Sequence, residues 1–142
     1  MITANEIRIG NWYKHLPVWS YRNEDLKEFY FQWEDRDWYA VGECTLNLQS
    51  IEAIPLTPEL LLKCGFEKET PDDKYGEVYI KEGFGFILRK VNFGKPMTPD
   101  YGFALELLKG DIWTTIIKRI PYLHQLQNIY QVFTQTELTV NL

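Results

Sequence analysis

The segment that most constrains the fold is the C-terminal stretch 119–138, which has the pattern of one amphipathic helix entered through a proline. At about 100° per residue, its large apolar side chains fall on one face. They are Tyr122, Leu123, Leu126, Ile129, Tyr130 and Phe133. Pro121 suits the first helical position, and Ile120 before it favours extended backbone. The pattern predicts a strand that leads directly into a helix, and a helix that docks on a sheet.

A second helix is predicted over 58–64. Thr57 is a good N-cap, and Pro58 fits the first helical position. Gly65 matches the left-handed residue that ends a helix, and Phe66 follows where a Schellman motif places an apolar residue. We therefore expect about two helical turns with defined caps at both ends.

The N-terminal region, residues 1–54, has the pattern of a small all-β unit. Short aromatic or β-branched runs predict strands at 7–13, 28–33, 38–41, 46–48 and 51–54. The polar residues 34–37 predict a turn that joins 28–33 and 38–41 as a hairpin. Several short strands in so few residues indicate a curled sheet or a small barrel, for which an SH3-like barrel is one form.

Residues 55–142 predict a second region of mixed type. Strands are expected at 77–81, 84–91, 101–108 and 111–120, with a charged turn over 67–76 and a loop over 92–100. The expected fold class is α+β, with an antiparallel sheet of about four strands packed by the C-terminal helix. The two regions form either two small domains or one compact unit, since 142 residues suffice for both.

Composition indicates a folded protein with an acidic balance. Hydrophobic residues make up 45% and aromatic residues 15%, which excludes a disordered tail. The formal net charge of −5 disfavours non-specific binding to nucleic acid, although basic residues cluster within 86–119. The first ten residues lack the pattern of a signal peptide, and no apolar run approaches the roughly 20 residues that cross a bilayer. We expect a cytoplasmic protein without a membrane partner.

No pattern of a metal, cofactor or catalytic site is found. Cys44, Cys64, His15 and His124 do not have the spacing of zinc ligands, so no metal or cofactor is expected. The serines lack the context of a nucleophile elbow, and Gly83-Phe84-Gly85 lacks the lysine and helix of a phosphate loop. The carboxylates of 34–37 are interpreted as a solvated turn.

Two sets of residues are candidates for an interaction surface. His124, Gln127, Asn128 and Gln131 form a polar stripe on the predicted C-terminal helix, either a recognition surface or, as we favour, a solvated helix face. Aromatic residues are dense over 12–39, and most of them are expected to build a core. Trp19 and Tyr21 are expected to be the most exposed, where rings can stack on a partner.

Three segments together carry a resemblance: RIGNW at 8–12, IPLTPELLLKCGF at 54–66 and LHQLQNIY at 123–130. In order and content they resemble a family of short proteins from Bacteroidetes genomes, often in prophage or mobile-element settings. The resemblance implies no activity, cofactor or catalytic residue. Cys64 and Gln135 depart from the family pattern, where a larger residue and a helix-ending glycine are expected. Gln135 is a poor left-handed cap, which leaves the end of the last helix open.

We therefore expect a non-enzymatic interaction module of a phage or mobile-element accessory protein, with another protein as its partner. One alternative is binding of single-stranded nucleic acid by the aromatic-rich β region and the 86–119 basic cluster. The other is a hydrolase whose site combines His124 with a distant carboxylate.

Overall fold

The computed structural model describes residues 2–69, 77–92 and 101–142. The chain divides into two compact units. Unit 1 comprises Met1–Pro55 and Tyr122–Asn128, and unit 2 comprises Leu56–Pro121 and Ile129–Leu142. Residues 70–76 of the turn predicted over 67–76 and residues 93–100 of the loop predicted over 92–100 lie outside the described residues.

Unit 1 is built on a three-stranded antiparallel sheet in the order β2-β1-β3. The strands are β1 (Trp12–His15), β2 (Phe29–Gln32) and β3 (Ile51–Glu52), and two 3-10 turns, η1 (Ala4–Glu6) and η2 (Leu48–Ser50), flank them. Tyr13 pairs with Phe31, and His15 pairs with Ile51. The sheet is open at β2 and β3, so the barrel form considered from the sequence is not what folds.

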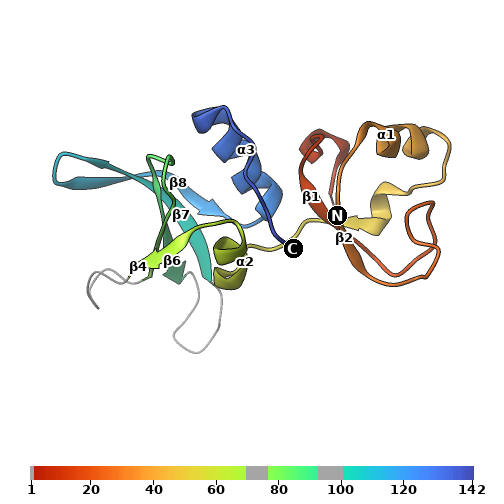
Figure 1. Cartoon of the computed structure of the whole chain (residues 1–142), viewed down its shortest axis with the longest axis horizontal. Helices are drawn as coiled ribbons and strands as arrows, with labels where there is room; N and C mark the ends of the chain where they lie inside the picture. Colours follow the sequence, from red (N-terminus) through yellow and green to blue (C-terminus); the bar gives the residue numbers. More distant parts are fainter. Residues whose placement is uncertain (1, 70–76, 93–100) are drawn as a thin grey trace. The chain divides into compact units, whose positions relative to one another are not determined.

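The predicted hairpin over 28–41 is wrong, because its second strand is a helix. Helix α1 (Asp35–Gly42) begins within the predicted turn (Figure 1). The backbone N–H of Glu34 donates to the Asp37 carboxylate at 2.8 Å, and acidic residues in the first turn favour the positive end of the helix dipole. Asp37 and Ala40 are buried while Tyr39 is exposed, which is a helical period and not the alternation of a strand. Unit 1 is therefore not all-β.

Aromatic side chains make most of the unit 1 core, as predicted. Tyr13 and Trp33 are fully buried, and their rings meet edge to face at 6.1 Å. Phe31 is buried on the same face, whereas its neighbour Tyr30 is exposed. The complete buried cluster is Ile2, Ile7, Tyr13, Phe31, Trp33, Ala40, Leu46 and Ile51.

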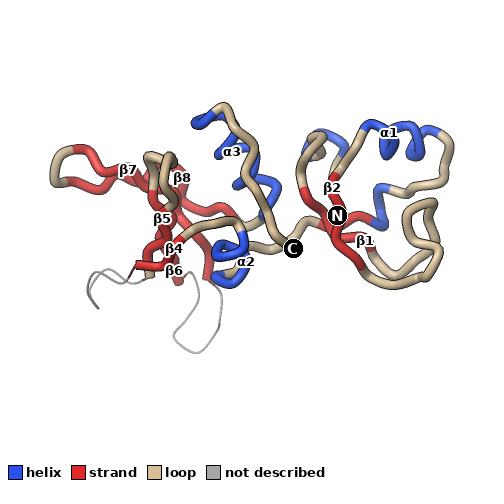
Figure 2. The backbone as a smooth tube through the Cα atoms, in the orientation of Figure 1, coloured by secondary structure: helices blue, strands red, loops and turns tan. Residues whose placement is uncertain are grey.

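Unit 2 contains a five-stranded antiparallel sheet in the order β4-β5-β6-β7-β8 (Figure 2). Its strands are β4 (Glu67–Glu69), β5 (Val78–Ile80), β6 (Ile87–Asn92), β7 (Tyr101–Lys109) and β8 (Ile112–Ile120). The four predicted strands are confirmed in place, and β4 is the one that the sequence analysis assigned to a turn. Three charged, exposed residues gave β4 no apolar pattern to detect.

Helix α2 (Pro58–Lys63) confirms the prediction made from its caps. The Thr57 hydroxyl accepts a hydrogen bond from the Leu60 N–H at 3.1 Å. At the other end Gly65 has φ +85°, and the Phe66 N–H donates to the Leu61 carbonyl at 3.1 Å. This is the Schellman geometry that the sequence predicted.

Replacing Gly65 with alanine is expected to lower the free energy of unfolding of unit 2 by about 1–2 kcal/mol, since an L-residue pays this in the left-handed region. A Cβ at this position would also lie 2.5 Å from the Lys81 Nζ. Calorimetric unfolding will measure the loss. Gly42→Ala is the control, because nothing lies within 4 Å of a Cβ there. Equal effects of the two changes would contradict the cap assignment.

Helix α3 (Leu123–Thr134) confirms the predicted C-terminal helix but begins later than predicted. Pro121 stands before the helix, where its carbonyl accepts the Leu56 N–H at 2.9 Å. The helix ends at Thr134 because Gln135 takes the left-handed conformation, with φ +57°. Gln135 therefore occupies the cap for which glycine is preferred.

The α+β class predicted from the sequence is confirmed: two antiparallel sheets and three α-helices, the last of which packs on unit 2 through its final turns. There Phe84 contacts Tyr130 and Phe86 contacts Phe133, with ring centroids 5.2 and 4.5 Å apart. Within the described part of the chain, no helix combines the length and apolar content needed to span a bilayer.

Candidate functional site

An open groove of about 740 Å³ lies on unit 2. Its walls come from the β5–β6 hairpin, the end of β7 and the start of β8. The lining residues are Gly65, Glu67, Ile80, Lys81, Glu82, Phe84, Gly85, Phe86, Ile87, Leu108 and Trp113. We call this surface the aromatic groove.

A series of ring–ring contacts supports the aromatic residues of the groove. Phe84 is buried and meets Phe66 edge to face at 5.9 Å and Phe86 at 5.4 Å. Phe86 is half-buried and packs on Phe133. The supporting rings fix the orientation of Phe86, so the groove presents a preformed apolar wall.

The opposite wall is formed by the β7–β8 hairpin, which extends beyond the rest of the sheet (Figure 1). Leu108 pairs with Trp113 across the hairpin, so both side chains lie on one face. Leu108 is 48% exposed and Trp113 is 42% exposed. A two-residue turn at Gly110 and Asp111, with Gly110 at φ +65°, sets this register.

The charged groups of the groove are Glu67, Lys81 and Glu82. Lys81 donates from Nζ to the Cys64 carbonyl at 3.1 Å, at the C-terminal end of α2. This position stabilises the helix dipole and commits the ammonium group to the protein. The two carboxylates are exposed and have no ion-pair partner among the described residues, so the charge that these residues leave at the groove is negative.

The groove offers binding surface and little acid–base chemistry. Cys64 lies beneath it, but burial raises the pKa of its thiol to about 12, only partly opposed by Lys81. A neutral thiol is a poor nucleophile. In the described ranges no group of three histidine, cysteine or acidic side chains is placed to hold a metal ion.

The predicted polar stripe of the last helix does not form one exposed surface. His124 and Gln127 are buried, and Asn128 and Gln131 are half-buried. Gln127 accepts the Trp12 N–H at 2.9 Å and donates to the Gly10 carbonyl at 3.3 Å. The solvated helix face that we favoured is therefore wrong for His124 and Gln127.

Asn128 binds the same N-terminal segment from the next position of the helix. Its Oδ1 accepts from the Arg8 Nε and from the Asn11 Nδ2, each at 2.8 Å. Arg8 also donates to the Asn11 Oδ1 at 2.9 Å. The polar stripe thus ties α3 to the residues before β1.

His124 lies between two tyrosines of unit 1. Its ring stacks on Tyr122 at 5.9 Å and meets Tyr13 at 5.4 Å, and neither ring nitrogen has a hydrogen-bond partner among the described residues. Burial lowers the pKa of His124, and the Glu6 carboxylate opposes this shift. A general base also needs an orienting partner and access to substrate, and this geometry supplies neither.

Of the two aromatic candidates, Trp19 is exposed and Tyr21 is half-buried. Trp19 is 62% exposed, beside the exposed Val18. Tyr21 is half-buried, packs against the unit 1 core and donates its hydroxyl to Asp37. Tyr39, which the sequence analysis placed in a strand, is 73% exposed.

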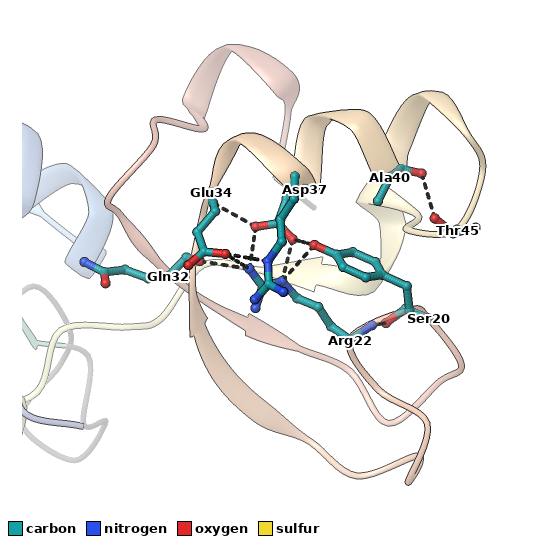
Figure 3. A network of polar contacts seen from close by, with 9 residues as sticks. Ser20, Arg22, Gln32, Glu34, Asp37, Ala40 and Thr45 are labelled. Atoms are coloured by element: carbon teal, nitrogen blue, oxygen red, sulfur yellow. Dashed lines mark hydrogen bonds and ion pairs between the residues drawn. The ribbon is translucent and has the colours of Figure 1, made fainter.

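A buried ion-pair network was missed from the sequence. Asp37 is fully buried and accepts two hydrogen bonds from Arg22, from Nε and, at 2.8 Å, from a terminal guanidinium nitrogen (Figure 3). The same guanidinium lies 3.0 Å from Glu34. The network joins the segment after Ser20 to the start of α1. The short spacing of the acidic residues within 34–37 resembled a solvated turn, and only the folded chain brings Arg22 to it.

Two residues of the basic cluster expected within 86–119, Arg89 and Lys90, are paired inside unit 2. Arg89 contacts Glu106 at 2.9 Å, and Lys90 lies 3.8 Å from Glu77 and over the Tyr101 ring. Lysine and arginine bind nucleic acid by neutralising its phosphates, so the pairing of Arg89 and Lys90 with carboxylates makes these two residues less suited to that role.

The aromatic groove was not predicted either. Large apolar residues lie near both hairpin turns in the sequence, but the alternation of side chains along a strand does not show that these residues are exposed.

No protein-family model matches the chain, and neither a curated protein nor a solved structure matches it significantly.

Proposed function

We propose that the chain is a non-enzymatic protein-interaction module whose aromatic groove binds an apolar segment of a partner protein. The observation that carries this proposal is the exposure of Leu108 and Trp113 beside the supported ring of Phe86. Large exposed apolar side chains that gather around a concave surface are typical of binding sites. The groove has the size for one or two anchoring side chains of a peptide.

The charge of the groove defines the partner further. Glu67 and Glu82 are exposed at its rim, while Lys81 is bound to the end of α2. A peptide with a large apolar anchor and neighbouring basic residues complements this surface. An acidic peptide would meet two carboxylates and is disfavoured.

The resemblance of the segments at 8–12, 54–66 and 123–130 supports a biological setting. We propose that the module belongs to an accessory protein of a phage or mobile element, and that it acts in the cytoplasm.

Selection of random peptides on the immobilised full chain tests the groove. The expected outcome is enrichment of peptides with an aromatic or large aliphatic anchor next to lysine or arginine. Phe86→Ala is expected to weaken a selected peptide by at least about tenfold, since central aromatic contacts dominate such interfaces. Titration calorimetry on the folded variant measures the change.

Trp19→Ala is the matched control, because Trp19 is an exposed ring of unit 1. We expect its affinity to equal that of the wild type. Loss of binding with Trp19→Ala instead of Phe86→Ala would refute the groove assignment. Salt-dependent binding to single-stranded oligonucleotides, without any peptide enrichment, would refute the proposed class of partner.

A further inference from the structure

Strand β7 extends beyond its neighbour β6 at the aromatic groove. The last residue pair of the two strands is Ile87 with Glu106, and β6 begins at Ile87, whereas β7 continues to Lys109. The same register would set Gly85 opposite Leu108. Gly85 belongs to no strand, and both of these residues line the groove. The groove therefore lies where the ladder between β6 and β7 ends.

The backbone of Leu108 is directed to the groove side of β7. In an antiparallel ladder the N–H and C=O of one residue point to the same neighbouring strand, and successive residues alternate. The Lys90 N–H donates to the Glu77 carbonyl at 2.9 Å, so Lys90 points to β5 and Ile87, three residues earlier, points to β7. Glu106, the partner of Ile87, points back to β6, and Leu108 two residues later has the same direction. No described residue outside the β7–β8 ladder is hydrogen-bonded to the Leu108 backbone.

The side chains around Leu108 suit a strand at this position. Leu108 and Trp113 are partners on the groove face, and both are exposed. Ile80 and Ile87 line the groove from β5 and β6. Nothing lies within 4 Å of a Cβ at Gly85, so the groove is open there. A segment that pairs with Leu108 would place every second side chain against this apolar surface.

We propose that the partner segment binds in an extended conformation, antiparallel to β7 and along the line that β6 leaves. One of its residues exchanges both backbone hydrogen bonds with Leu108, and the side chain of that residue is the apolar anchor. A second anchor follows two positions away, on the same face, and basic residues beside the anchors meet Glu67 and Glu82. The inference rests on the proposed function, since it names the conformation of the segment that the groove binds.

Amide hydrogen exchange of the free chain tests the edge of β7 without a partner. The Leu108 N–H faces the groove, whereas the Leu107 N–H points to β8. The amide of Leu108 is expected to exchange at least about tenfold faster than that of Leu107, because only the latter must open a hydrogen bond first. Nuclear magnetic resonance measures both rates on one sample. Equal protection of the two amides would overturn the proposal.

Backbone methylation of a selected peptide tests the pairing itself. N-methylation of the anchor residue removes the donor to the Leu108 carbonyl and is expected to weaken binding by about tenfold. The matched control is N-methylation of the next residue, whose N–H points away from β7. Its affinity is expected to equal that of the unmodified peptide. Titration calorimetry measures both affinities, and the Leu108 amide is expected to become protected when the unmodified peptide is added.

The outcomes separate this pairing from the groove proposal. Selected peptides whose anchors recur every three or four residues, as on a helix, would overturn the extended pairing and leave the groove as the binding site. Equal effects of the two methylations would do the same. Failure to select any peptide would remove the groove as a binding site, and the pairing with it.

Discussion

Asp37→Asn is expected to lower the free energy of unfolding of unit 1 by about 3 kcal/mol at pH 7, because it removes one partner of a buried ion pair. The carboxylate is fully buried, while the side chain of Arg22 retains only 12% exposure. Asparagine leaves the guanidinium with Glu34 as its remaining anionic partner, which places the expected loss at the low end of the usual range. The variant also weakens the bond from the Glu34 N–H that starts α1.

Tryptophan fluorescence during urea unfolding is a suitable measurement, because Trp113 is the one tryptophan of the five that lies outside unit 1. Arg36→Ala is the matched control. Arg36 also pairs with Glu34, but both side chains are exposed, and such a pair contributes at most about 1 kcal/mol. A loss for Asp37→Asn no larger than that of the control would show that the buried ion-pair network does not stabilise unit 1.

The same carboxylate predicts a pH dependence. Burial alone would raise the pKa of Asp37, but hydrogen bonds from Arg22, Tyr21 and the Glu34 backbone outweigh burial and hold this pKa below its usual value. The unfolded chain therefore takes up a proton first as the pH falls. The stabilisation by Asp37 is complete above about pH 4, the usual pKa of aspartate, and is lost as the pH falls through the lowered value. The stability difference between wild type and Asp37→Asn is expected to narrow over that range.

Elements that depend on residues close together in the sequence could be predicted from the sequence. Helix α2 could be placed from Thr57, Pro58 and Gly65, because each cap acts within one turn of its own backbone. Strands β5 to β8 followed from apolar and aromatic runs bounded by turn residues. The α+β class followed from these elements alone, since a helix with an apolar stripe needs a sheet to cover it.

Errors arose where distant residues decide the outcome. Helix α1 has aromatic residues that fit a strand, and its start depends on the Asp37 carboxylate, which Arg22 neutralises from another segment. Strand β4 forms because β5 offers it an edge, although its own residues carry no apolar pattern. Propensity is a weak guide in both cases, because tertiary contacts override it.

The candidate site was predictable only in part. Exposure of Trp19 was anticipated, but the aromatic groove depends on the supporting contact of Phe86 with Phe133, far along the chain. The helical period of the sequence identified the polar stripe but not its role. The period shows which residues share one face of a helix, and it does not show which segment of the protein covers that face. Gln127 shows the difference: a polar residue on the polar face is fully buried because backbone groups of the N-terminal segment meet it.

Gln127→Leu is therefore expected to lower the free energy of unfolding of unit 1 by about 2–3 kcal/mol. Leucine has a similar size but cannot accept from the Trp12 N–H, and an unsatisfied buried donor costs about 1–3 kcal/mol. The Gly10 carbonyl keeps the bond from the Gln32 Nε2 at 2.9 Å, so the cost falls mainly on Trp12. Gln131→Leu, one turn later and half-buried, is the control, with an expected change within about 0.5 kcal/mol.

The same pair of variants separates a structural stripe from a recognition surface. A recognition role predicts that folded Gln127→Leu loses affinity for a partner while its unfolding curve stays close to that of the wild type. The hydrogen bonds described here predict the reverse: a less stable unit 1, followed by tryptophan fluorescence, and unchanged affinity for a peptide bound in the groove of unit 2. Wild-type stability in Gln127→Leu would mean that another group satisfies the Trp12 N–H, and the stripe would again be open to a role in binding.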